Sequence, residues 1–181
     1  MISSLTPYRA GKAGDSCMQT LILASTAVST ALITGLFYAY TCSVIPGLHP
    51  LPDGAYLAAM QSINRAILNP VFFLSFLGTL LLLPLSTWLA YGQSNRLCFG
   101  LLFLASGIYI LGVIGVTLGG NVPLNDALDA VALTKASSSE LARLRTAFEP
   151  AWTRWHTIRT VACLVTLILV IVSCLSQEKT P

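Results

Sequence analysis

Charged side chains are scarce in this sequence. Lys, Arg, Asp and Glu together make up 9% of the 181 residues, whereas soluble domains carry about 25%. The charges are also confined, because residues 16–52, 66–95, 97–125 and 160–177 contain none. A hydrocarbon core about 30 Å thick needs about 20 apolar residues of helix. The composition therefore excludes a soluble domain and predicts four membrane helices, at residues 19–44, 71–91, 97–118 and 157–175.

Sequence signals of cofactor and nucleic-acid binding are also missing. The net charge is +3, and no basic run resembles a nucleic-acid-binding segment. No H-E-x-x-H, C-x-x-C, phosphate-loop or dinucleotide motif occurs. The histidines are His49 and His156, and His49 lies in a proline-rich turn that is unsuited to a haem ligand. We therefore expect no metal, no haem or other cofactor, and no nucleic-acid partner.

Three polar stretches interrupt the apolar pattern. Residues 119–126, with the sequence GGNVPLND, follow the third apolar run, and we interpret them as a loop at the membrane surface. Residues 61–69 belong mainly to a predicted amphipathic helix at residues 55–68, which lies on the membrane or caps the bundle. Residues 152–159 stand at the entry to the last helix. Four antiparallel helices would bring these stretches to the same side of the membrane.

The polar stretches supply the candidate site residues, which are Gln61, Asn64, Arg65, Asn69, Asn121, Asn125, Asp126, Trp152, Trp155, His156 and Arg159. In the last helix, Trp152, His156 and Arg159 share a face at spacings of four and three. Each residue type also has an ordinary role at this depth. Tryptophan anchors at the interface, asparagine caps helices, and arginine snorkels or pairs with Asp126 or Asp129. A shared site and a set of separate structural residues both fit the sequence.

Proline, glycine and other small residues predict where helices stop and where they touch. The Pro-Gly pair at residues 46–47 is expected to end the first helix. Pro150 is expected to break or kink the chain after a helix at residues 140–148. Small residues four apart predict a close contact on the first helix, at Ala27, Ala31, Gly35 and Ala39. A second contact face is predicted on the third helix, at Gly112, Gly115 and Gly119.

The predicted fold is all-α: an integral membrane four-helix bundle with a short amphipathic helix between helices 1 and 2 and a helical loop between helices 3 and 4. We expect a disordered extension at residues 1–17, a single domain at 18–176 and a polar tail at 177–181. The first apolar run exceeds the roughly 7–15 residues of a signal-peptide core, so we interpret it as a retained membrane helix. The density of Lys and Arg favours a multi-pass position in the cell membrane with both termini in the cytoplasm.

Five short motifs occur along the chain in a characteristic order. They are residues 35–40 (GLFYAY), 46–48 (PGL), 60–70 (MQSINRAILNP), 120–125 (GNVPLN) and 152–160 (WTRWHTIRT). In this order the motifs resemble those of the anthrone oxygenase family of small four-helix membrane proteins. The resemblance covers residues 18–173. At one position the chain departs from the family pattern, because His156 stands where we expect a carboxamide.

The resemblance implies a cofactor-free oxidation of an anthrone to an anthraquinone by O₂. The benzylic CH₂ of an anthrone is acidic because its conjugate base is aromatic, so a base and an oxyanion-stabilising group are needed. The candidate base is His156 or Asp126, and the candidate oxyanion partner is Arg159 or Arg65. The two tryptophans of the last polar stretch are candidates to stack on the rings.

A second reading is a non-enzymatic membrane protein that binds a lipid, a quinone or a partner subunit through the same polar face. A transporter is disfavoured, because no acidic residue lies in the middle of a predicted membrane helix. The expected partners are thus the lipid bilayer and a small apolar aromatic molecule.

Overall fold

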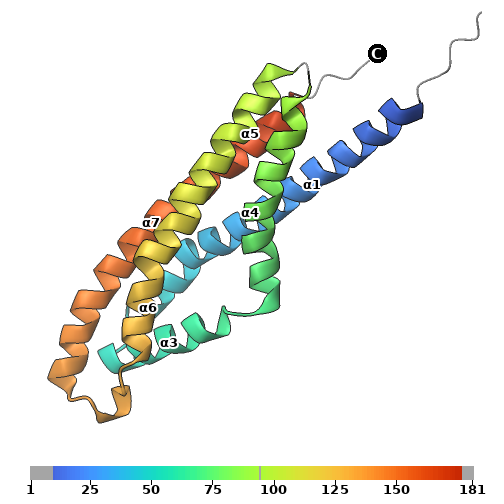
Figure 1. The fold of residues 1–181 in the computed structure, drawn as a ribbon. Helices are drawn as coiled ribbons and strands as arrows, with labels where there is room; N and C mark the ends of the chain where they lie inside the picture. Colours follow the sequence, from blue (N-terminus) through green and yellow to red (C-terminus); the bar gives the residue numbers. More distant parts are fainter. Residues whose placement is uncertain (1–9, 94, 177–181) are drawn as a thin grey trace, which may run out of the picture.

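The computed structural model describes residues 10–93 and 95–176, and throughout this part of the chain the regular elements are helices. Four of these helices are long and apolar enough to cross a membrane, and we call them spans 1 to 4: Cys17–Leu48, Pro70–Tyr91, Arg96–Asp129 and Ser138–Leu175. The predicted all-α four-helix bundle is confirmed (Figure 1). The chain is an integral membrane protein by the length and apolarity of these helices.

The spans are built from several helical segments. Span 1 comprises most of α1 (Ala10–Ala39), a π-helical turn (Tyr40–Val44) and α2 (Ile45–Leu48). Span 2 is α4 (Pro70–Tyr91), and span 4 is α7 (Ser138–Leu175). Span 3 joins four pieces into one helix: α5 (Arg96–Ile108), two π-helical turns (Tyr109–Gly115 and Thr117–Asn121) and α6 (Val122–Asp129). Of the predicted extension and tail, residues 1–9 and 177–181 lie outside the described residues.

The bundle closes through four helix pairs, since α1 packs against α4 and α7, and α5 packs against the same two helices. The short helix α3 (Asp53–Ala66) lies across one end of the bundle, against α6 and α7 (Figure 1). Its amphipathic pattern explains this position, because its apolar face, with Tyr56, Leu57 and Met60, is buried in a second hydrophobic cluster that includes residues of α6 and α7. Gln61 fastens the helix by donating to the carbonyls of Leu128, 2.8 Å away, and Val131.

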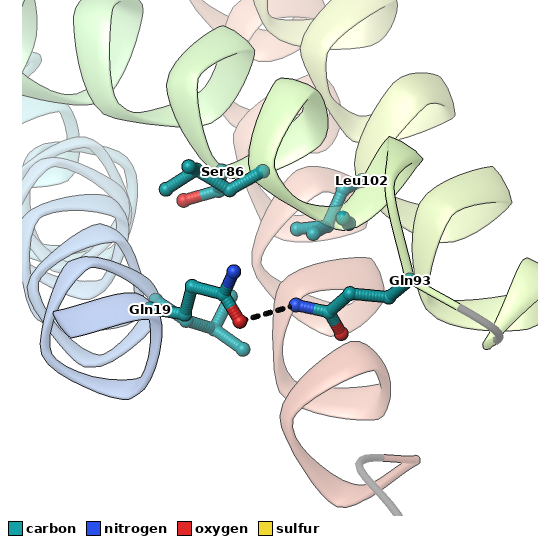
Figure 2. A pocket seen from close by; sticks show the side chains of 7 residues that line it. Gln19, Ser86, Gln93 and Leu102 are labelled. Carbon is teal, nitrogen blue, oxygen red and sulfur yellow. Dashed lines mark hydrogen bonds between the residues drawn. The ribbon is translucent and has the colours of Figure 1, made fainter. Parts of the chain in front are cut away.

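Capping side chains fix where three of the helices begin. Asn69 accepts hydrogen bonds from the backbone of α4, and Asn95 does the same for α5. Ser137 and Glu140 form a capping box at the start of α7. The end of the bundle opposite α3 is closed by short polar contacts. Figure 2 shows one of them, in which Gln93 donates to Gln19 at 2.7 Å.

The polar stretch at residues 119–126 is helical, so its interpretation as a loop was wrong. A π-helical turn carries the chain through Asn121, and α6 continues to Asp129. The first span ends within one residue of the stop expected at residues 46–47, since α2 runs to Leu48. In both places a proline follows a π-helical turn and falls in the first turn of the next α-helical segment. A proline is tolerated there because its missing N–H needs no partner.

Helix α7 passes through Pro150 without interruption, so the predicted boundary there is also not found. The chain instead turns before Ser138, after a 3-10 turn at Leu133–Lys135. This long helix carries residues 152–159 on the same rigid element as the membrane-spanning part of α7. The relative positions of the polar side chains in residues 152–159 are therefore fixed by a helix and not by a loop.

Most of the predicted small-residue face of α1 does not mediate packing within the chain, because Ala31, Gly35 and Ala39 are exposed, whereas Ala27 packs against the core. Hydroxyl side chains make the contact instead. The Oγ1 of Thr26 lies 2.8 Å from Ser86 Oγ, which links α1 to α4. Interhelical hydrogen bonds of this kind hold helices together where lipid removes the hydrophobic drive for association.

Two glycines of span 3 mark close helix contacts. A Cβ placed on Gly112 would lie 2.8 Å from the Cβ of Ala162, which confirms Gly112 as a contact residue. A Cβ on Gly119 would meet no described atom within 4 Å, so the prediction that Gly119 is a helix contact residue was wrong. Gly120 is the packed residue, because a Cβ there would lie 2.5 Å from the ring of Trp155.

Candidate functional site

A cavity of about 260 Å³ lies between the spans at the end of the bundle that carries α3. Its apolar walls come from α1, α4 and span 3, and its polar groups come from α3, α6 and α7. Most of the lining is aromatic or aliphatic, including Phe37, Phe72, Phe76, Leu118 and Val122. A mostly apolar cavity with a few convergent polar groups is the usual form of a small-molecule site.

Arg159 contributes the positive charge of this cavity. Its guanidinium lies 4.4 Å above the ring of Phe37 and 5.5 Å from that of Trp152. Nη1 is 3.5 Å from the hydroxyl of Thr117. No carboxylate of the described residues forms an ion pair with it. A guanidinium held among rings without a counterion is a strong site for an anionic oxygen.

His156 is fully buried and is bonded at both ring nitrogens. Its Nδ1 accepts hydrogen bonds from Nε of Arg159 at 3.2 Å and from Nη2 at 3.0 Å. A guanidinium only donates, so the ring is the neutral form with its hydrogen on Nε2. That hydrogen points to Thr41 Oγ1 at 3.0 Å, and Thr41 in turn donates to the carbonyl of Phe37. The imidazole therefore holds Arg159 in place.

Aromatic rings enclose this pair. Trp152 stacks on His156 with ring centroids 5.0 Å apart and planes 11° apart. Tyr40 lies against both, at 5.3 Å from Trp152 and 5.2 Å from His156. Phe37 meets the edge of the imidazole at 5.9 Å. The rings cover part of the half-buried arginine, which strengthens any electrostatic contact that it makes.

Asn125 joins three helices at the polar side of the cavity. Its Oδ1 accepts from Nε1 of Trp152 at 2.7 Å and from Nδ2 of Asn64 at 3.0 Å. Asn125 lies on α6, Trp152 on α7 and Asn64 on α3. The carboxamide therefore fixes the tryptophan and the short helix relative to each other, with all three side chains at the cavity wall.

Charged groups surround the cavity on the α3 side. Arg65 donates to Asp129 at 2.6 Å, and both side chains are well exposed. The ion pair of Arg159 with Asp126 or Asp129 that the sequence left open is thus replaced by a pair between Arg65 and Asp129. Asp126 also lines the cavity and is exposed, and it has no ion-pair partner in the described part of the chain.

The structure brings seven of the predicted site residues to this cavity: Asn64, Arg65, Asn125, Asp126, Trp152, His156 and Arg159. The other four do not line it. Gln61 is bonded to the end of α6, and Asn69 caps α4. Asn121 is buried and donates to the carbonyl of Trp152 at 3.2 Å, while Trp155 packs on Gly120.

Sequence reasoning missed the aromatic and hydroxyl residues that complete the site. Phe37, Tyr40, Thr41 and Thr117 surround Arg159 and His156, yet all four belong to spans that hydropathy treats as lipid-facing or core. Three of them lie in π-helical turns: Tyr40 and Thr41 begin one turn, and Thr117 begins another. A π-helical turn adds a residue and rotates the following face, and such turns are frequent at functional sites. The GLFYAY motif was the available signal.

A separate ionic cluster fastens the connection between span 1 and α3. Arg145 donates to Asp53 at 3.2 Å and to Glu149 at 2.8 Å, and its guanidinium lies 4.4 Å above the ring of Tyr56. Burial, followed by the nearby Glu149 carboxylate, raises the pKa of Tyr56 above its usual range. His49 completes the cluster through Glu149 at 2.8 Å. The ionic cluster therefore holds α3 in place beside the cavity, and its side chains are not part of the cavity lining.

The site is an aromatic cavity built around an arginine, within four helices that are long and apolar enough to cross a membrane. Residues 70–169 match the family model described as anthrone oxygenase. The match covers more than half of the chain, and the protein belongs to this family. No curated protein and no solved structure matches the chain.

Proposed function

We propose that this protein is a membrane oxygenase that oxidises an apolar, anthrone-type ring compound to a quinone with O₂ and without a cofactor. The observation that carries the proposal is the guanidinium of Arg159, which faces an aromatic cavity and has no carboxylate partner among the described residues. The cavity of about 260 Å³ is close to the roughly 300 Å³ at the lower end of small-molecule sites. Family membership supports the same reaction class.

The reaction needs one proton transfer and one oxygen addition. A base removes a proton from the benzylic CH₂, and the electron pair moves into the rings to give an anthrolate oxyanion. The anion transfers electrons to O₂, and a C–O bond forms at the former CH₂ carbon to give a peroxide. Loss of the second hydrogen from that carbon, with cleavage of the O–O bond, gives the quinone carbonyl and water. One O₂ is consumed, and its oxygen atoms end in the quinone and in water.

Arg159 is the group that stabilises the oxyanion in this proposal. Its charge is fixed by His156 and shielded from water by Phe37 and Trp152, so it acts in a medium of low dielectric. The hydroxyl of Thr117 lies beside it. Removing a single preorganised donor of this kind costs about 10²–10³ in kcat.

Asp126 is the base that the geometry favours over His156. The lone pair of His156 Nδ1 is occupied by Arg159, and its other nitrogen carries the hydrogen that faces Thr41. Asp126 lines the cavity and is exposed, so its carboxylate can accept a proton and release it to water. His156 is then a positioning residue for Arg159.

We extend the proposal to the cellular setting. A single domain at residues 18–176 would lie in the cell membrane, with both termini in the cytoplasm. Lys and Arg are denser in the short terminal-side segments, with four residues there, than in the longer segments of the α3 side, which carry six. O₂ and flat aromatic molecules both partition into lipid, so a site within the bundle receives both from the bilayer. Reporter fusions at each terminus would test the orientation, and a signal from outside the cytoplasm for either fusion would contradict it.

The direct test is to add an anthrone and O₂ to the purified protein and to measure quinone formation above the spontaneous rate. Arg159→Met should reduce the catalysed rate by about 10²–10³. Arg154→Met is the matched control, because Arg154 is on the same helix but is exposed and outside the cavity. Equal activity of the two variants would reject the role of Arg159. Tight binding of the ring without turnover would favour the non-enzymatic reading.

A further inference from the structure

A second apolar hollow, of about 740 Å³, runs along the outside of the bundle between α1 and α4. We call it the lateral groove. Both helices belong to candidate membrane spans. Its rim consists of exposed aliphatic side chains: Leu21, Val28, Leu32, Val71 and Leu74. Because this surface lies at membrane depth, the groove opens toward lipid.

The groove has a definite structural cause. At its floor α1 and α4 touch, because Ser29 Oγ donates to the carbonyl of Ser75 at 3.1 Å and accepts from Thr79 at 3.0 Å. A Cβ on Gly78 would lie only 3.2 Å from Ser29 Oγ. From this contact the two helices diverge toward Pro70, where α4 begins (Figure 1). The divergence leaves the space that the groove occupies.

The lateral groove and the site cavity share a wall. Leu36, Ile67 and Phe72 line both of them. Phe72 stacks on Phe76, which belongs to the cavity, with ring centroids 5.0 Å apart and planes 19° apart. These residues therefore stand between the lipid-facing groove and the cavity that contains Arg159. Side-chain rotations of this kind occur on the ps–ns timescale when the residue is not tightly enclosed.

We propose that the lateral groove is the entrance through which a flat apolar ring compound dissolved in the bilayer reaches the cavity. This inference rests on the proposed function for the identity of the ligand. The alternative approach on the α3 side passes the ion pair of Arg65 and Asp129. A ring compound that took this path would first have to leave lipid for water, at about 25 cal/mol per Å² of apolar surface. The groove avoids that cost.

The experiment follows entry of anthracene, an unreactive ring compound, by quenching of Trp152 fluorescence. The full chain is placed in lipid vesicles with Trp88→Phe and Trp155→Phe, which leaves Trp152 at the cavity wall as the sole fluorescent tryptophan. Anthracene is delivered from a second vesicle population. Leu36→Phe places a larger side chain between the groove and the cavity and so obstructs the passage. Leu81→Phe is the matched control, because Leu81 is on α4 and is 70% exposed but lies outside the groove.

Leu36→Phe should slow the quenching about tenfold, the effect of a barrier raised by about 1.4 kcal/mol. Leu81→Phe should leave the rate unchanged. Phe72→Ala should quicken quenching, because it removes the largest shared side chain. Unchanged rates in both Leu36→Phe and Phe72→Ala, or a loss of amplitude alone, would overturn the lateral entrance.

The two proposals fail in different ways. Slowed entry in Leu36→Phe without quinone formation from an anthrone would keep the entrance and reject the oxygenase chemistry. Quinone formation with entry rates indifferent to Leu36 and Phe72 would keep the chemistry and reject the entrance. Absence of quenching in the chain with an unaltered groove would overturn the entrance together with the binding site.

Discussion

The guanidinium of Arg159 donates to Nδ1 of His156 through two nitrogens, Nε at 3.2 Å and Nη2 at 3.0 Å. One turn of α7 therefore contains both the charge of the site and the group that orients it. The arrangement makes the imidazole an acceptor toward Arg159 and a donor toward Thr41. A side chain that can accept on one side and donate on the other should be able to replace it.

His156→Gln should therefore keep most of the activity, because a carboxamide offers both an acceptor and a donor. His156→Phe should lose activity nearly as far as Arg159→Met, since the ring fills the space but releases the guanidinium. The measurement is quinone formation from an anthrone, with KM and kcat determined separately. Loss of activity in His156→Gln equal to that in His156→Phe would show that the imidazole itself transfers a proton.

Asp126→Asn should lower kcat by about 10²–10⁴, the range for loss of a general base. Asp129→Asn is the matched control on the same helix, and it should keep kcat because Asp129 pairs with Arg65. Small carboxylates such as acetate should partly restore Asp126→Asn, whose side chain is exposed and leaves a route for them. If Asp126→Asn turned over at the original rate, the base would have to be another group or water.

Gly120→Ala should destabilise the protein by about 1–3 kcal/mol, because the added methyl group overlaps the ring of Trp155 and forces α7 away from span 3. Gly119→Ala is its neighbour and control. A Cβ there meets no described atom within 4 Å, so alanine should be neutral or stabilise the helix by about 0.5–1 kcal/mol. Thermal unfolding in detergent measures both. Equal stability of the two variants would contradict the close packing of Trp155 on Gly120.

The sequence predicted those parts of the fold that depend on hydropathy and caps. The four charge-free runs correspond to the four spans, and Asn69 caps a helix, which is the ordinary role that the sequence left open for an asparagine. Counting membrane crossings also brought Asn64, Asn125 and Arg159 to one end of the bundle, where all three line one cavity. These features are local or follow from the number of crossings, so a single sequence is enough to predict them.

Helix faces were not predictable in the same way. A membrane helix is apolar toward lipid as well as toward its neighbours, so hydrophobic periodicity does not mark the packed face. The sequence therefore pointed to Gly35 as a contact, whereas the packed face of α1 carries Thr26 and Thr34. The π-helical turns make the packed face still harder to predict, because each turn changes the direction in which the following side chains point. Tyr40 and Thr117 reach the site through such turns.

Asn121 and Asn125 lie one helical turn apart and differ in the hydrogen bonds that their side-chain oxygens accept. Asn125 Oδ1 accepts two hydrogen bonds, from Trp152 Nε1 and Asn64 Nδ2. Asn121 Oδ1 is buried and has no partner among the described residues, and its Nδ2 donates to the carbonyl of Trp152 at 3.2 Å. That carbonyl lies inside α7, where the helix supplies its own donor.

Asn125→Leu should thus lower the free energy of unfolding by about 1–3 kcal/mol, since it leaves two donors without an acceptor. Asn121→Leu should be neutral or stabilising, because it removes a buried oxygen that is already unpaired. Thermal unfolding of both variants in the same detergent makes the comparison. Destabilisation of Asn121→Leu to the same extent would mean that Oδ1 binds a buried water molecule. That water would then link span 3 to α7 beside the site.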